Sequence, residues 1–214
     1  MKRTALALLL ASALSGSLTA CFPLVLGGAA GTAVVATDRR TSGAYVDDQA
    51  IVLKAGDQMN RLLPDAHVNL TSFNRAVLMT GEVQTDEQRQ QAEMLVRGIP
   101  GVMRVYNYTL VTVPSTFGQR NNDAWITAKV RGRLMSGQGN YSAQSFKVVS
   151  ERGVVYLFGL VTQAEGDAAT AVASQTAGVL KVITLFEYLM PLPQAQQPSQ
   201  SSYPAPTASQ PAAQ

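Results

Sequence analysis

The chain has 214 residues, a formal net charge of +3, one histidine and one cysteine. This inventory argues against a His/Cys metal cluster, a Cys/His pair and a conventional Ser-His-Asp triad, so we expect a non-enzyme with no cofactor and no metal. A site of carboxylates alone, or of serine and lysine, stays open, but no spacing points to one. Two positive charges, Lys2 and Arg3, lie in a segment expected to be cleaved, so the mature charge is +1 (3 minus 2) and gives no support for nucleic-acid binding.

Residues 1–20 have the layout of a cleaved secretory signal peptide. Lys2 and Arg3 are followed by an apolar stretch from Ala5 to Leu14 and then by small residues. The apolar stretch has about ten residues, whereas a helix that crosses a hydrocarbon core needs roughly twenty. The sequence therefore predicts export and disfavours a membrane-spanning helix.

The segment Leu18-Thr19-Ala20-Cys21 resembles the bacterial lipobox, in which the cysteine sulfur carries a diacylglycerol. Lipidation explains a lone cysteine in an exported protein, the alternative being an ordinary signal peptide followed by a chance cysteine. With a further acyl chain on its amino group, Cys21 would be anchored stably, because two or more chains suffice. Phe22 stands where an aspartate would direct inner-membrane retention. We therefore expect the outer membrane, facing the periplasm, with surface exposure left open.

The two ends of the mature chain lack the pattern of a folded domain. Residues 21–46 are rich in glycine, alanine and valine, which predicts a lipidated, flexible tether; the alternative is that residues 23–36 dip into the bilayer beside the lipid. Residues 191–214 contain only Pro, Gln, Ala, Ser, Thr, Leu and Tyr. Such a tail should be disordered, because it cannot bury enough apolar surface to offset its ordering entropy. It is either a cell-wall contact or a spacer.

Between these ends the chain contains an internal repeat. Three blocks recur in order at offsets of 75, 78 and 77 residues, and the changes of offset place the insertions in loops. The pairs are Asp48–Ile51 with Asp123–Ile126, Val77–Val83 with Val155–Val161, and Gly101–Val105 with Gly178–Val182. The sequence therefore predicts two copies of one domain, residues 47–113 and 121–190, joined by a linker at 114–120.

Both copies predict the same order of elements. The opening helix has one apolar face, made of Ile51, Ala55, Met59 and Leu62 in the first copy and of Ile126, Val130 and Leu134 in the second. Strands follow at about 67–72 and 76–83, and at about 145–150 and 154–161. A second helix begins at Thr85 or Thr162, each with capping-box spacing, and a last strand covers 102–113 or 179–189. Both helices are expected on one face of the sheet, because each apolar stripe must meet the apolar side.

This duplicated pattern resembles the BON domain. An aspartate opens a helix, a strand carries apolar-x-apolar-x-Gly-x-Val, and Gly-Val-x-basic-Val follows the second helix, twice over residues 47–190. The resemblance implies an α+β fold of two tandem αββαβ domains, each a three-stranded mixed sheet with two helices packed on one face. Two such domains behind a lipobox look like the dual-BON outer-membrane lipoproteins of Gram-negative bacteria. That resemblance implies a non-catalytic module that binds phospholipid, keeps the outer membrane impermeable, and helps cells survive envelope stress and divide.

Four glycines of the repeat are expected to be structural. Gly81 and Gly159 lie where a strand leads to the second helix, and Gly101 and Gly178 open the last strand, where chain reversal or close backbone approach favours glycine. His67, near the start of a strand, is expected at the surface or half-buried.

The opening helix of the second copy carries the candidate membrane-binding residues. Trp125, Lys129 and Arg133 stand at i, i+4 and i+8 and so share one face, which Arg131 and Arg120 could extend. The first copy has Ala50, Lys54 and Gln58 at the matching places. An indole favours the membrane interface, and basic residues beside it favour anionic phospholipid. Residues 47–113 carry six basic and eight acidic groups, net −2, whereas residues 120–190 carry seven and five, net +2.

Two alternatives compete with lipid binding by this helix. Trp125 could pack against the other domain or the linker, with the basic residues as a solvated face. The domains could instead form an adaptor that docks an envelope-assembly or cell-wall protein, held at the membrane only by the lipid on Cys21. The preferred headgroup, the protein partners and the oligomeric state are not determined by the sequence.

Overall fold

The computed structural model describes residues 38–137 and 140–189. The predicted signal peptide, Cys21, the tether as far as residue 37 and the tail at 191–214 lie outside these residues. No helix in the described ranges is both long enough and apolar enough to cross a membrane.

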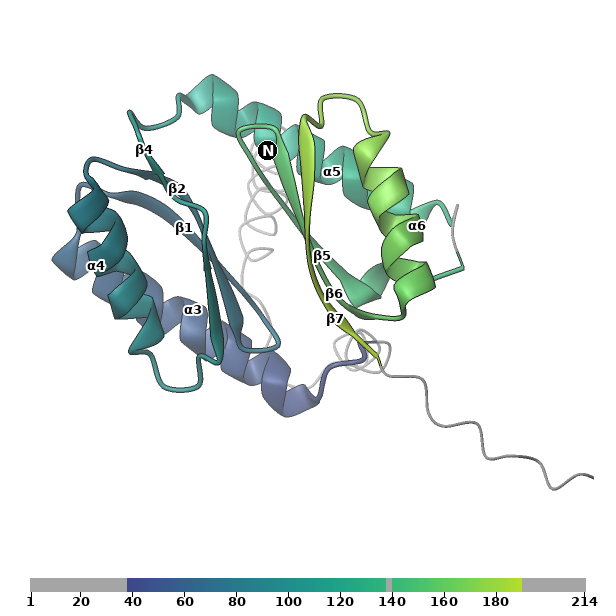
Figure 1. Cartoon of the computed structure of the whole chain (residues 1–214), viewed down its shortest axis with the longest axis horizontal. Coiled ribbons are helices and arrows are strands. Elements are labelled where there is room, and N and C mark those ends of the chain that lie inside the picture. Colours follow the sequence, from purple (N-terminus) through teal and green to yellow (C-terminus); the bar gives the residue numbers. More distant parts are fainter. Residues whose placement is uncertain (1–37, 138–139, 190–214) are drawn as a thin grey trace, which may run out of the picture.

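The described chain folds as two α+β domains of the same topology, which confirms the predicted fold class (Figure 1). The first contains α3 (Ser42–Leu62), β1 (His67–Phe73), β2 (Ala76–Val83), α4 (Asp86–Arg97), β3 (Arg104–Asn107) and β4 (Leu110–Val111). The second contains α5 (Phe117–Met135), a short 3-10 helix (Ala143–Ser145), β5 (Phe146–Glu151), β6 (Val154–Val161), α6 (Gln163–Ser174) and β7 (Lys181–Tyr188). The central strand of each sheet pairs antiparallel with the strand before it and parallel with the strand after α4 or α6, which makes both sheets mixed.

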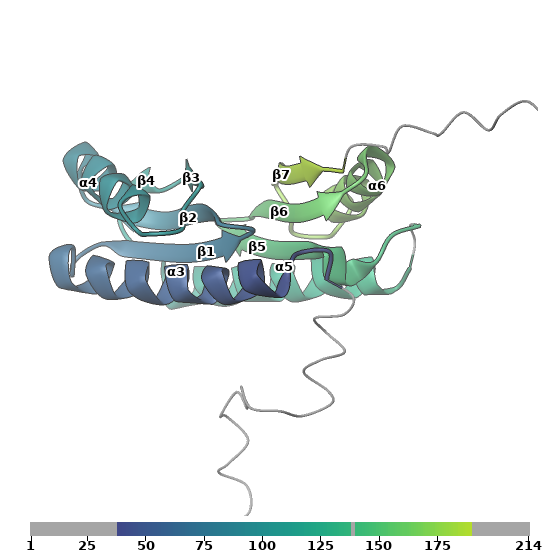
Figure 2. The same ribbon diagram turned by 90° about the horizontal axis from the view of Figure 1, so that it is seen from below.

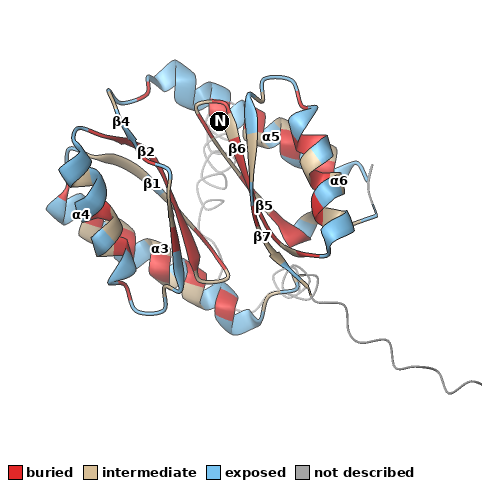
Figure 3. Cartoon of the chain, in the orientation of Figure 1, coloured by how far each residue is buried: buried red, intermediate tan, exposed pale blue. Residues whose placement is uncertain are grey.

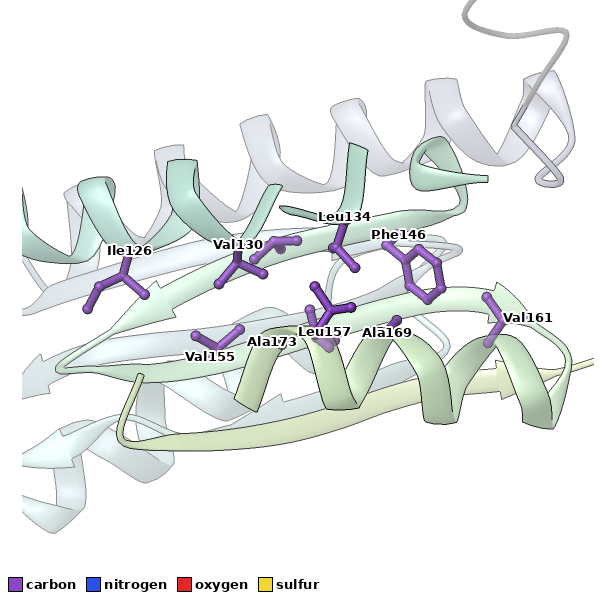
Figure 4. Packing of buried hydrophobic residues seen from close by; sticks show 11 residues of the cluster. Ile126, Val130, Leu134, Phe146, Val155, Leu157, Val161, Ala169 and Ala173 are labelled. Atoms are coloured by element: carbon purple, nitrogen blue, oxygen red, sulfur yellow. The ribbon is translucent and has the colours of Figure 1, made fainter. Parts of the chain in front are cut away.

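Each domain has its own core between the helices and one face of its sheet. In the second domain, Ile126, Val130 and Leu134 of α5 meet Val155 and Leu157 of β6, and α6 closes the core with small side chains (Figure 4). In the first domain, Ile51, Ala55 and Met59 of α3 take the same part. Leu62 does not, because it is 54% exposed. Leu63 is buried instead of Leu62. Leu63 is the C-cap residue, where the backbone leaves the helix with a φ of −136° just before Pro64, so its side chain does not follow the helical spacing.

Both opening helices begin earlier than predicted. α3 begins at Ser42, inside the expected tether, because the Thr41 side chain accepts a hydrogen bond from the Ala44 N–H and caps the helix. α5 begins at Phe117, inside the expected linker, because Thr116 and Gln119 form a capping box. The predicted tether at 21–46 and linker at 114–120 therefore each lose their last residues to a helix.

The aspartate that opens each repeat ties the opening helix to the turn between the first two strands. Asp48 accepts hydrogen bonds from the backbone N–H groups of Asn74 and Arg75, both at 2.8 Å. Asp123 accepts the equivalent bonds from Arg152 and Gly153, also at 2.8 Å. Asn74, Arg75 and Arg152 have positive φ angles, so these tight turns leave N–H groups that need acceptors. The repeated aspartate is therefore a structural residue.

The two domains pack sheet against sheet, with their helices outermost (Figure 1). β2 is buried along its whole length, as Figure 3 shows, because alternate side chains face opposite layers. Val77 and Met79 enter the first domain's core, whereas Ala76 and Leu78 face the second domain. Alternate side chains of β6 likewise face the second domain's own core and the first domain. Phe158 of β6 stacks on Phe73, with 5.7 Å between the ring centroids.

The last strand of the first domain is interrupted, unlike the single strand predicted at 102–113. Asn107 Oδ1 accepts hydrogen bonds from the backbone and the side chain of Thr109, which breaks the strand into β3 and β4. Tyr108, at the break, lies 5.1 Å from Tyr156 of the second domain between ring centroids. The interruption thus places an aromatic ring in the contact between the domains.

Glu82 of β2 is a fully buried carboxylate at the contact between the domains. Its carboxylate is 0% exposed and accepts a hydrogen bond from Arg152 of the second domain at 2.8 Å, and His67 Nδ1 lies 2.8 Å from its other oxygen. Burial alone raises the pKa of this carboxyl, but hydrogen bonds from His67, Ser115 and Arg152 outweigh it and hold the pKa below the ordinary glutamate value. Glu82 therefore stays charged and joins both domains and the linker.

Replacing Glu82 with glutamine removes this charge with little change of shape. We expect Glu82→Gln to lower the free energy of unfolding by about 1–3 kcal/mol at pH 7, because Arg152 loses its partner. The folded pKa of Glu82 lies below its unfolded value of about 4.3, so its charge stabilises the folded state fully above that pH. This stabilisation is lost as the pH falls through the folded pKa. The difference between variant and wild type should therefore shrink toward pH 3 in urea unfolding. Asp65→Asn, at an exposed carboxylate in the loop after α3, is the control, and a pH-independent difference for Glu82→Gln would contradict the assignment.

Candidate functional site

Trp125 lies on the outward side of α5 and is 64% exposed. The buried side of the helix is formed by Asp123, Ile126, Val130 and Leu134. The indole is therefore not packed into the contact between the domains. α5 and α3 lie along the same side of the molecule (at the bottom of Figure 2), with α4 and α6 toward the other side.

Lys129 and Arg133 flank Trp125 and reach the end of α6. Lys129 Nζ donates a hydrogen bond to the carbonyl of Ala177, and Arg133 Nη1 donates one to the carbonyl of Gln175 at 2.8 Å. Cations at a helix C-terminus satisfy unpaired carbonyls and complement the helix dipole. Both side chains thus stabilise the domain, and each keeps its positive charge on the same side of α5.

Arg131 and Arg120 lie on the other flank of α5. At about 100° per residue they fall roughly 120–140° from Trp125, across the helix from Lys129 and Arg133. Arg120 Nη1 lies 3.2 Å from His67 Nε2, which links α5 to the first domain. The structure therefore does not bring all five predicted lipid-binding residues together.

Two exposed apolar residues on α5 were not among the predicted site residues. Phe117 is 80% exposed and Met135 is 72% exposed. On a helical projection both lie about 80° from Trp125, on the side away from Lys129. We call Phe117, Trp125, Met135, Lys129 and Arg133 the α5 strip: it has an apolar edge, a central indole and a basic edge. Phe117 was missed because its segment was assigned to the linker.

Three of the four repeated glycines have backbone roles, and two of the four lie elsewhere than predicted. Gly81 and Gly159 lie inside β2 and β6 rather than at their ends. Gly81 has a φ of +99°, and a Cβ there would lie 2.1 Å from the carbonyl oxygen of His67, so only glycine fits. Gly101 and Gly178 also have positive φ angles, whereas Gly159 does not. His67 is half-buried, with 27% of its side chain exposed.

The described residues form no cluster of three or more His, Cys, Asp or Glu side chains that could hold a metal ion. The contacts of charged side chains among them include ion pairs, a helix cap and hydrogen bonds to backbone groups. The features that stand out are thus an exposed amphipathic helix strip and a contact between two sheets.

These features define a tandem-repeat α+β protein with an exposed helix face. The BON domain model matches residues 47–113 and 122–190, so the chain belongs to the BON-domain family. It is 37% identical to the outer membrane lipoprotein DolP of Haemophilus influenzae over 175 residues, 80% of this chain and 90% of that protein. It is also 31% identical to the 21 kDa hemolysin of Actinobacillus pleuropneumoniae over 155 residues, 71% of this chain and 79% of that protein. The predicted location in the outer membrane as a lipoprotein is confirmed by this relationship.

The repeat supplies a matched test of the contact between Lys129 and α6. Lys54 occupies the matching position of α3. We expect Lys129→Gln to lower the free energy of unfolding by about 0.5–1.5 kcal/mol, because a charged donor at a helix C-terminus is lost, and Lys54→Gln to change it by less than about 0.5 kcal/mol. Urea unfolding measures both, and equal effects would show that Lys129 does not stabilise α6.

Proposed function

We propose that this outer-membrane lipoprotein binds anionic phospholipid through the α5 strip of its second domain and thereby supports membrane integrity and survival of envelope stress. The observation that best supports this proposal is the indole of Trp125, which is 64% exposed and lies in the middle of the strip. The domains serve as a binding module and not as an enzyme.

Across the α5 strip the side chains change from apolar on one edge to basic on the other. Phe117 and Met135 offer apolar surface on one side, and the flat body of an indole enters the headgroup boundary while its nitrogen stays hydrated. On the other side Lys129 and Arg133 each gain about 1 kcal/mol near an anionic surface. The carbonyls of Ala177 and Gln175 take one hydrogen bond from each basic side chain and leave its charge in place.

The first domain is a poorer candidate, although it has the same fold. Its net charge is −2 against +2 for residues 120–190, and α3 has Ala50 and Gln58 where α5 has Trp125 and Arg133. α3 does expose Leu53, which is 73% exposed and offers a matched control. We propose an architectural or partner-binding role for the first domain.

Cosedimentation with vesicles tests the proposal on the mature chain carrying Cys21→Ser, which removes the lipid anchor. Neutral vesicles are compared with anionic ones at low and high salt. We expect salt-sensitive binding to anionic vesicles, weakened about tenfold or more by Trp125→Glu. Leu53→Glu, which adds the same charge to an exposed apolar site of the other domain, should have little effect. Circular dichroism and urea unfolding establish that all variants fold.

Other outcomes decide against the α5 strip. Equal losses from Trp125→Glu and Leu53→Glu would point to net charge alone, and binding unchanged by both would place the lipid site elsewhere. No binding by the wild-type chain would favour the adaptor, in which the domains dock an envelope protein.

We propose in addition that Cys21 carries the lipid anchor, since it follows the lipobox segment Leu18-Thr19-Ala20. Cells that express the full chain with Cys21→Ser should yield the protein in the soluble periplasmic fraction and without label after feeding with radioactive palmitate. The wild-type chain should be labelled and should sediment with outer membranes. Label retained in the variant would show that another residue is acylated.

A further inference from the structure

Residues 38–41, ahead of α3, contact the second domain although they lead into the first. Arg39 forms a two-pronged ion pair with Glu165 of α6, with N–O distances of 2.7 and 2.8 Å. The same guanidinium donates a hydrogen bond to the carbonyl of Leu160 at the end of β6, at 3.3 Å. The corner between β6 and α6 therefore binds an arginine that lies more than 120 residues earlier in the chain.

The next residue, Arg40, binds the first domain. Its side chain is only 9% exposed and pairs with the buried Asp48 at 2.7 Å and with Asp38. Its guanidinium also lies over the ring of Phe73, 4.2 Å from the centroid, and Phe73 is the residue that stacks on Phe158 of the second domain. Two adjacent arginines thus bind the two different domains.

The Glu165 carboxylate is well prepared for this contact. It already accepts a hydrogen bond from the backbone N–H of Thr162 as part of the capping box that begins α6. Hydrogen bonding to Arg39, reinforced by the cap, lowers the pKa of Glu165 to about 2. A carboxyl with a lowered pKa keeps its stabilising contact above its ordinary value and loses it only as the pH falls through the lowered one. The contact should therefore persist in mildly acidic conditions.

We propose that residues 38–41 form an interdomain strap that fastens the start of the folded region to both domains. The strap brings the chain that arrives from the N-terminal segment onto the contact between the domains, so a pull on that segment acts on both domains together. The second copy has no such feature, because Ser115 stands at the position that matches Arg40. The strap does not depend on lipid binding, because none of its residues belongs to the α5 strip.

Limited trypsin digestion tests the strap, because trypsin cleaves after Arg39 and Arg40 and needs their side chains free. The mature chain carrying Cys21→Ser is digested, and the appearance of fragments that begin at Arg40 or Thr41 is followed by mass spectrometry. Glu165→Gln keeps a side chain that can cap α6 but loses the charge. We expect this variant to be cut at the strap about fivefold faster than wild type. Asp57→Asn, which removes an exposed ion pair within α3, is the control and should be cut at the wild-type rate.

A double variant separates the contact from general loosening of the fold. Arg39→Gln should accelerate cleavage after Arg40 as much as Glu165→Gln does, and the two changes together should add little more, because either one already removes the contact. Hydrogen exchange at the Ala44 and Tyr45 amides, which the Thr41 cap protects, should rise in the same variants while the middle of α3 stays protected. Additive effects of the two changes, or a strap cut at the wild-type rate in Glu165→Gln, would overturn the proposal.

Discussion

The contact between the two sheets is the constraint on which the rest of the molecule depends. A three-stranded sheet with helices on one face leaves its other face uncovered. A domain of about 70 residues buries little apolar surface in its own core and is therefore only marginally stable alone. Here each copy covers the open face of the other, so the central strands β2 and β6 are buried on both sides and largely apolar. This burial explains why β6, Val154–Val161, contains no charged side chain, and it lets the two copies stabilise each other by packing.

Polar groups within that contact give it one defined arrangement. Apolar faces alone would tolerate sliding, because the hydrophobic effect has no direction. Glu82 with Arg152, and Asn69 with Glu151 at 2.8 Å, satisfy each other only in one register of the two sheets. The copies are therefore free to differ on their outer helices, where α5 has gained Trp125 and Arg133 while α3 has not.

The repeat made most of the fold predictable from the sequence, whereas contacts between the copies were not. Offsets between matching blocks located the helices and strands, and the threonines at 85 and 162 correctly marked the start of the second helices. The helix starts at Ser42 and Phe117 were missed, because the glycine-rich and proline-rich stretches around them resemble linkers. Only the structure shows that a threonine caps each helix there. Trp125 could be singled out from the difference between the copies. The bonds of Lys129 and Arg133 to α6, and of Arg39 to Glu165, join residues far apart in sequence, and no local pattern encodes them.

The way in which the anchor and the folded domains are joined determines how strong the α5 strip has to be. With Cys21 as the proposed anchor, 16 residues (22–37) lie between the lipid-bearing cysteine and Asp38, a reach of at most about 60 Å. A weak surface held within that distance of a membrane meets lipid at a high effective concentration, so a few kcal/mol from one indole and two cations suffice to orient the protein. The strap matters for this orientation, because it directs the tether onto the contact between the domains rather than onto the first domain alone. Under the proposed lipid binding, an anchor joined to both domains leaves the α5 strip to determine which face of the protein is presented to the membrane.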